Sequence, residues 1–216
     1  MADANHINFQ KEMDALIEKN QADGVVPRLF LHSCCAPCSS YVIEYLSDYF
    51  EITVFYYNPN LYPDREYARR SGEQKRFIDE IKTKYPVSYF DCDFIPNEFY
   101  NLVKGLEQEK EGGRRCEKCF ELRLSKTAEK AKAEEFDYFA TTLTISPLKN
   151  ASLINQIGYE QSKRYGVKYL ASDFKKKNGF KRSTELSRQY GLYRQDYCGC
   201  VFSKTERERQ KANIDD

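Results

Sequence analysis

Residues 28–40 read RLFLHSCCAPCSS, and the predicted fold depends on this stretch. Its first five residues form a short apolar run, which is typical of a buried β-strand. Its last two residues are serines, which are suitable N-terminal caps for a helix that we expect to run to about Tyr49. A second strand, rich in β-branched and aromatic residues, is expected from Glu51 to Tyr57. Strand, loop, helix and strand form the first unit of a parallel α/β sheet.

Helix and strand patterns continue to alternate along the chain. Helical periodicity marks residues 64–84, 97–111, 116–135 and 151–165, and short apolar runs predict strands at 86–90, 136–142 and 167–171. We therefore predict an α/β protein with a parallel-sheet, Rossmann-like (nucleotide alpha-hydrolase-like) three-layer core and a helical, basic C-terminal elaboration. Such sheets bind ligands at the carboxyl ends of their strands, where the winding order reverses. The cysteines of residues 34–38 follow such a strand end.

The length of 216 residues suits one domain with an elaboration, and no repeat or linker divides the sequence. We expect a single α/β domain over residues 1–216. A hydrophobic content of 41% and a charged content of 31% are typical of a soluble globular protein. The sequence has neither an apolar run of about 18 residues nor a basic-then-apolar leader. A cytoplasmic location without a membrane segment is therefore expected.

Eight cysteines require an explanation, because a chain of this length does not depend on disulfide staples. Seven of them are clustered, as Cys34, Cys35 and Cys38, as Cys116 and Cys119, and as Cys198 and Cys200, with Cys92 alone. A CxxC pair is half of a zinc site, half of an iron–sulfur site or a dithiol redox pair. Adjacent cysteines are unusual in structural zinc sites, and five thiols exceed one tetrahedral zinc. The spacing favours iron–sulfur over zinc and leaves both open.

The segment Cys198-Gly199-Cys200 has a different character. A disulfide across a single flexible glycine is strained, and strained disulfides are labile rather than structural. The segment therefore favours an electron-relay pair over a structural crosslink. Cys92 is most simply a small buried hydrophobic residue.

The formal net charge of +1 is an average over unlike segments. Residues 163–194 carry +8, residues 195–216 carry −1, and the first 162 residues carry −6. A basic block of this kind faces phosphate or is a solvated helix surface, and charge alone does not choose between them. Two polar stretches, residues 58–67 and 142–150, follow predicted strands and are expected on one rim of the sheet.

In its cysteine motifs and in the polar stretches between them, the chain resembles the QueH-type epoxyqueuosine reductases. The resemblance rests on His32-Ser33-Cys34-Cys35-Ala36-Pro37-Cys38-Ser39, Tyr57-Asn58-Pro59-Asn60 with Glu66-Tyr67, Arg115-Cys116-Glu117-Lys118-Cys119-Phe120, Thr141-Thr142-Leu143 with Ser146-Pro147, and Tyr197-Cys198-Gly199-Cys200. These motifs span about residues 29–203. The ordered CCxPC, CxxC and CGC set is specific.

The resemblance implies the last step of queuosine formation, in which an epoxide on the modified wobble base of tRNA is reduced to the alkene. It implies a 4Fe-4S cluster with an additional iron beside it and no cobalamin. Carried over residue by residue, the cluster ligands are Cys34, Cys35, Cys116 and Cys119. Cys198 and Cys200 form the redox-active disulfide, and Cys38 is the candidate for the adjacent iron.

Further roles follow from the chemistry of the implied reaction. Removing an epoxide oxygen requires two electrons, a Lewis acid and a proton source, and Asp64, Glu66 and Tyr67 are candidates for the acid or the metal shell. Basic residues with interleaved aromatics suit an anticodon arm whose target base is splayed out. The candidate contacts to tRNA are Lys149, Lys175, Lys176, Lys177, Lys181 and Arg182. The electron donor is a further partner that the sequence does not identify.

Two functions of other classes remain as alternatives. An ATP-dependent tRNA sulfur transferase is built on a similar sheet, but its Ser-Gly-Gly-x-Asp-Ser loop is replaced by Ser33-Cys34-Cys35 at the first strand end. A zinc-stabilised nucleic-acid-binding module without chemistry would use the same cysteines. The absence of a GxGxxG or GxxxxGK[ST] loop also argues against a nucleotide-dependent enzyme.

Overall fold

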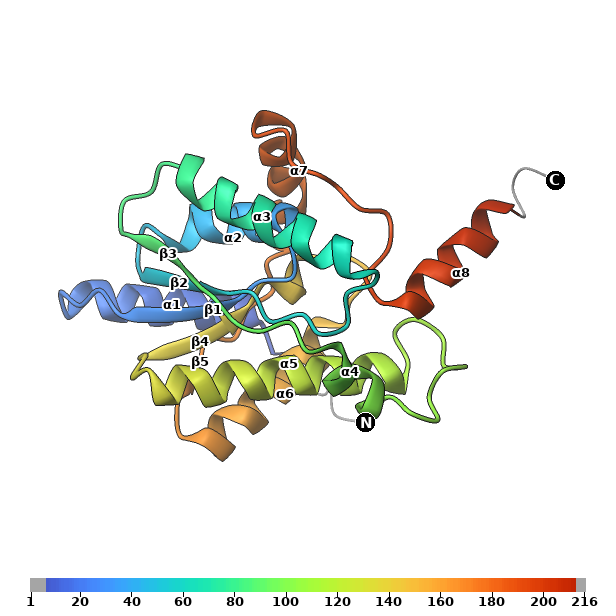
Figure 1. Ribbon diagram of the computed structural model, residues 1–216. Coiled ribbons are helices and arrows are strands. Elements are labelled where there is room, and N and C mark those ends of the chain that lie inside the picture. The colour runs from blue at the N-terminus through green and yellow to red at the C-terminus, as the bar shows by residue number, and fades with distance from the viewer. Residues whose placement is uncertain (1–6, 213–216) are drawn as a thin grey trace, which may run out of the picture.

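The computed structural model describes residues 7–212, which fold around a five-stranded, all-parallel sheet (Figure 1). The strands are β1 (Arg28–His32), β2 (Glu51–Phe55), β3 (Val87–Phe90), β4 (Tyr138–Thr141) and β5 (Lys168–Tyr169). Their order across the sheet is β3-β2-β1-β4-β5. The predicted α/β class with a parallel sheet is confirmed.

Helices cover both faces of the sheet. They are α1 (Phe9–Ala22), α2 (Ala36–Leu46), α3 (Asp64–Glu80), α4 (Pro96–Leu102), α5 (Arg114–Ala133), α6 (Ala151–Tyr165), α7 (Gly179–Gln189) and α8 (Val201–Ala212), with a short 3-10 helix, η1 (Thr142–Ile145). Leu29 and Leu31 of β1 pack with α2, α3 and α7, whereas Phe30 packs with α5 and α6. This alternation follows the two-residue period of a strand whose two faces are both buried. No described helix is both long enough and apolar enough to cross a bilayer.

The winding order reverses between β1 and β4. From β1 the chain moves outward to β2 and β3, and it then returns to add β4 and β5 on the other side. His32 at the end of β1 is in register with Phe55 of β2 and with Thr141 of β4. Because the connections after β1 and β4 leave in opposite directions, an opening forms beyond these two strand ends.

His32 ties the three central strand ends together. Its Nδ1 lies 2.9 Å from the Thr141 hydroxyl and its Nε2 lies 3.2 Å from the carbonyl oxygen of Tyr57. Burial lowers the pKa of His32 to about 3, so the ring is neutral and donates from one nitrogen only. Since the Tyr57 carbonyl can only accept, Nε2 carries the proton and Nδ1 accepts from Thr141.

Two predicted helices differ from the structure. Helix α2 begins at Ala36, so Ser39 and Ser40 lie inside its first turns and donate to the carbonyls of Ala36 and Pro37. The helix predicted at 97–111 is wrong beyond Leu102, where turns replace it. Gly105, inside the predicted range, adopts a positive φ of 85°, which a continuous helix does not allow.

Gly158 provides a test of the packing between α6 and β5. A Cβ at Gly158 would lie 2.3 Å from the ring of the buried Tyr169, whereas one at the exposed, helical Gly72 would meet nothing within 4 Å. We expect Gly158→Ala to lower the free energy of unfolding by about 1–3 kcal/mol through overpacking. Gly72→Ala should raise it by about 0.5–1 kcal/mol. Urea unfolding measures both, and equal stability of the two variants would contradict the close contact.

Candidate functional site

The first cysteine group lies directly beyond β1. Cys34 and Cys35 occupy the connection from β1 to α2, Cys35 is the N-terminal cap residue of α2, and Cys38 lies in its first turn. The three Sγ atoms lie within 4.8 Å of one another, and those of Cys34 and Cys35 are 3.9 Å apart. Three thiols this close can share one metal ion, because each offers one soft sulfur ligand.

The three thiols do not ionise alike. Hydrogen bonds from Cys35 and Cys38, together with the charge of Lys149, hold the pKa of Cys34 well below its usual value. The same contact with Cys34 raises the pKa of Cys35 to about 12, and that of Cys38 is also raised. Without a cation, one negative charge is therefore favoured in the group and further charges are resisted.

The second group brings together Cys116, Cys119, Cys198 and Cys200 around a small cavity of about 20 Å³. Cys116 and Cys119 lie in the first two turns of α5, at the start of the helix that the periodicity of residues 116–135 predicts. The Sγ of Cys116 accepts a hydrogen bond from Gly112 N–H at 3.2 Å, and that of Cys200 accepts one from Ser203 N–H at 3.4 Å. Burial raises the pKa of Cys119 to about 12. All eight cysteines are free thiols.

The turn Cys198-Gly199-Cys200 is seated on the loop that precedes α3. Gly199 has a φ of 134°, and a Cβ there would lie 2.4 Å from Leu61, so no other residue fits. Its carbonyl accepts a hydrogen bond from Tyr62 N–H at 2.9 Å. The buried Arg70 donates to the Cys198 carbonyl at 3.4 Å. The turn therefore holds Cys198 and Cys200 of the second group in a fixed position, with Cys198 also at the cavity that Cys34 and Cys38 line.

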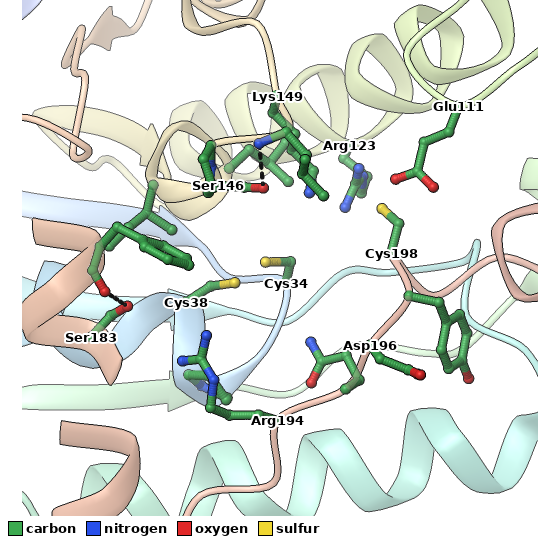
Figure 2. Close-up of a pocket in the computed structure, with 18 residues that line it drawn as sticks. Cys34, Cys38, Glu111, Arg123, Ser146, Lys149, Ser183, Arg194, Asp196 and Cys198 are labelled. Carbon is green, nitrogen blue, oxygen red and sulfur yellow. Dashed lines mark hydrogen bonds between the residues drawn. The ribbon is translucent and has the colours of Figure 1, made fainter. Parts of the chain in front are cut away.

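A larger cavity of about 240 Å³ opens at the reversal between β1 and β4 (Figure 2). The loop after β1, the segment after β4 and the segment before α8 form its walls. Thiols line it from both groups, namely Cys34 and Cys38 from the first and Cys198 from the second. Figure 2 shows these three sulfurs on opposite sides of one space, with Lys149 and Arg123 above them. Cys198 lines both cavities and links them.

Arg123 of α5 lies between the two cysteine groups. Its side chain is buried and lines both cavities. Its Nε donates to the Cys119 carbonyl and its Nη1 to Asn58, while its buried Nη2 has no partner among the described residues. Burial alone would lower the pKa of Arg123, but the negative charge that Cys119 and Cys198 carry when ionised raises it. A buried guanidinium with an unused donor requires an anion beside it.

The acid and metal-shell candidates predicted from the sequence do not line either cavity. Asp64 is exposed in the first turn of α3. Glu66 pairs with Arg70 at 2.7 Å, and the Tyr67 hydroxyl donates to the Tyr56 carbonyl at 3.4 Å.

The carboxylates that line the larger cavity are Glu111 and Asp196, which sequence reasoning missed together with Arg123 and Arg194. Glu111 lies five residues before Cys116 and Asp196 lies two before Cys198. Proximity to the cysteine motifs was the available signal for both.

The basic residues predicted to contact tRNA differ in whether they already have a charged partner within the chain. Lys149 lines the larger cavity, and although burial would lower its pKa, the Cys198 and Cys34 thiolates raise it. Three others form ion pairs within the chain, Lys175 with Asp173, Lys177 with Asp14 and Arg182 with Glu44. Lys176 and Lys181 are exposed and form no ion pair with the described residues.

The basic block from 163 to 194 is not one surface. Residues 163–168 join the end of α6 to the start of β5, at the edge of the sheet opposite the cysteines. Two of its aromatic residues, Tyr169 and Phe174, are buried in the core rather than available for stacking. Phe180 is partly exposed and lines the larger cavity.

Comparison with known proteins agrees with this arrangement. The family model described as epoxyqueuosine reductase QueH matches residues 29–206. A protein named epoxyqueuosine reductase QueH from Streptococcus pyogenes is 47% identical over 199 residues, which cover 91% of this chain and 78% of that protein. The proteins of the same name from Haemophilus influenzae and Thermotoga maritima are 38% and 34% identical, over 87% and 86% of this chain and 78% and 95% of theirs. The matched span contains all three cysteine motifs, and the chain belongs to the epoxyqueuosine reductase QueH family.

Proposed function

We propose that this chain is an oxidoreductase that reduces epoxyqueuosine to queuosine at the wobble position of tRNA, the last step of queuosine formation. The observation that carries the proposal is the cavity in which Cys34 and Cys38 of one motif face Cys198 of another, beside the buried Arg123 and the half-buried Lys149, in a chain of the QueH family. The reaction adds two electrons and two protons to the epoxide and releases its oxygen as water. Oxidation of a Cys198 and Cys200 dithiol to the disulfide supplies that number of electrons and protons, and an external electron donor then restores the dithiol.

The residues fit a 4Fe-4S cluster with an adjacent iron. The donor set is rich in thiolates, and the unused Nη2 of Arg123 is a buried cationic donor that faces it, as a cluster of net negative charge requires. We assign Cys34, Cys35, Cys116 and Cys119 as cluster ligands and Cys38 to the adjacent iron. When bound, such a centre supplies electrons singly and a Lewis acid for the epoxide oxygen. Cys198 and Cys200 remain the redox pair.

The geometry also suggests a second grouping. Cys34, Cys35 and Cys38 are close enough to hold a single ion, while Cys116, Cys119, Cys198 and Cys200 surround the small cavity. In that arrangement the CGC turn would ligate metal instead of relaying electrons. The two groupings predict different iron contents for a Cys198 variant. In the first, Cys198 is not a ligand and its replacement leaves the iron content unchanged, whereas in the second its replacement removes a ligand and iron is lost.

The RNA partner is a tRNA carrying epoxyqueuosine, which also implies a cytoplasmic reaction. Lys149 inside the cavity, with Lys176 and Lys181 exposed on the α7 side, is positioned for phosphate. Lys175, Lys177 and Arg182 contribute less, because each is already paired with a carboxylate. Among the alternatives, a sulfur transferase would need an ATP loop that this chain lacks at the end of β1, and a zinc module does not explain an open cavity with thiols on opposite walls.

The proposal predicts a brown protein after anaerobic purification, with about four or more irons per chain and broad absorption near 400 nm. Incubation with a reductant and epoxyqueuosine-containing tRNA should yield queuosine, measured by nucleoside mass spectrometry. The same tRNA without protein is the control. A colourless protein holding one zinc, inactive on this tRNA, would refute the proposal.

The division of labour among the cysteines predicts different losses in two variants. Cys116→Ser should lose the cluster, because a ligand is removed, whereas Cys198→Ser should keep the wild-type iron content and stop turnover. Iron analysis and the nucleoside assay measure the two properties on the same samples. Cys92→Ser, at a cysteine outside both cavities, is the matched control and should retain both. Equal iron loss in Cys116→Ser and Cys198→Ser would favour the second grouping.

The position of Arg123 beside the proposed cluster predicts that this residue affects the reduction potential of the cluster. A buried cation beside the cluster stabilises the reduced, more negative state, so Arg123→Met should shift the midpoint potential to more negative values. A redox titration followed by electron paramagnetic resonance measures the shift. Arg69→Met is the control, because Arg69 packs its guanidinium on Tyr193 and lines neither cavity. An unchanged potential in Arg123→Met with full iron content would contradict the placement of the cluster beside Arg123.

A further inference from the structure

Two exposed apolar side chains stand at the larger cavity. Leu148 is 83% exposed, more than any other large hydrophobic side chain in the described chain, and Phe180 is 39% exposed. Both line the cavity that holds Cys34, Cys38 and Cys198, from the segment after η1 and from the start of α7. Exposed apolar side chains that continue the largely apolar lining of a cavity are unfavourable in the free protein and mark a binding surface.

Leu148 is held in place by its neighbours. Its backbone N–H donates to the Ser146 hydroxyl at 3.3 Å, and Lys149 N–H donates to the Ser146 carbonyl at 3.2 Å. The Asn150 side chain then caps α6 by accepting from Leu153 N–H at 3.1 Å. The exposed side chain therefore projects from a hydrogen-bonded turn that is fixed to a helix start.

Phe180 is fixed in a different way. Gly179, which begins α7, lies so close to the core that a Cβ there would be 2.0 Å from the Phe174 carbonyl and 2.4 Å from Tyr41. The first turn of α7 is therefore seated directly on Tyr41, and Phe180 follows from it towards the cavity. The Arg194 guanidinium lies 5.8 Å from the Phe180 ring centre.

Positively charged side chains predominate around Leu148 and Phe180. Lys149 and Arg194 line the cavity near them, and Lys181 is exposed next to Phe180. The two lining carboxylates, Glu111 and Asp196, lie on the side of Cys198 in Figure 2, across the cavity from Ser183 of α7, and Asp196 is paired with Lys211. An apolar pair among cations suits a nucleobase and its phosphates, because bases stack on apolar and aromatic surfaces while phosphates take the cations.

We propose that Leu148 and Phe180 form a two-sided clamp at the mouth of the cavity, which holds the anticodon loop of the tRNA with the wobble base extruded towards the cysteines. The inference rests on the proposed function and adds the contact surface for the RNA. Chemistry on a base within a folded loop requires that the base leave its stack, and the clamp replaces the stacking that is lost. The phosphates lie on the side of Lys149, Lys181 and Arg194, away from Glu111 and Asp196.

The test measures binding of an anticodon stem-loop by Leu148→Ala and Phe180→Ala over a range of salt concentrations. Each variant should weaken binding by about tenfold without changing the salt slope, because the lost contact is stacking rather than charge. Phe180→Tyr should bind as the wild type does. Lys181→Ala should instead make the salt slope shallower by about one.

Two matched controls accompany these variants. Leu102→Ala removes an exposed leucine of α4 that lines neither cavity, and Lys163→Ala removes an exposed cation at the opposite edge of the sheet. Both should bind the stem-loop normally, and thermal unfolding confirms that every variant is folded. Wild-type binding by Leu148→Ala and Phe180→Ala would overturn the clamp. Wild-type protein that binds the stem-loop through both residues but reduces no epoxyqueuosine would support the clamp and overturn the proposed function.

Discussion

The pairing of β1 between β2 and β4 is the constraint on which the site depends. It places the start of the first cysteine motif at the centre of the sheet, where the connections after β1 and β4 part. The neutral His32 fixes this arrangement by joining β1 to Thr141 and to the Tyr57 carbonyl, without adding a charge to the interior. The opening that results is deep enough for thiols of the first motif to face Cys198, which the chain delivers more than 160 residues later.

Cations and ionisable thiols lie next to each other in the site, and each stabilises the charge of the other. A buried guanidinium or ammonium without an anion is strongly unfavourable, yet Arg123 and Lys149 line the larger cavity. Negative charge on the neighbouring cysteines, Cys119 and Cys198 beside Arg123 and Cys198 and Cys34 beside Lys149, raises the pKa of both groups. Arg70 has a carboxylate partner in Glu66, and it therefore serves to seat the CGC turn through the Cys198 carbonyl. Cations and sulfur sites thus depend on one another for stability.

The sequence was sufficient for the features that have local signals. Alternating strand and helix patterns predicted the parallel sheet, and the helical periodicity of residues 116–135 placed Cys116 and Cys119 at the start of a helix. It was insufficient where a tertiary contact decides the outcome. Lys177 and Arg182 look like free cations in the sequence, but their carboxylate partners, Asp14 and Glu44, lie more than 130 residues before them. Arg123 has no motif of its own, and only the packing of α5 against the sheet shows that it lies between the two cysteine groups.

The positions of Asp64, Glu66 and Tyr67 bear on the source of protons in the proposed reaction. Their places in the first turns of α3 suggested an acid near the epoxide, but Glu66 is committed to Arg70 and Tyr67 to a backbone carbonyl. A dithiol that becomes a disulfide releases two protons with its two electrons, so the reaction does not require a separate acid at these positions. Glu111 lines the cavity on the side of Cys198 and forms no ion pair among the described residues, so it is the carboxylate placed to pass those protons on, whereas Asp196 is paired with Lys211. The proton and electron routes would then both begin at the CGC turn.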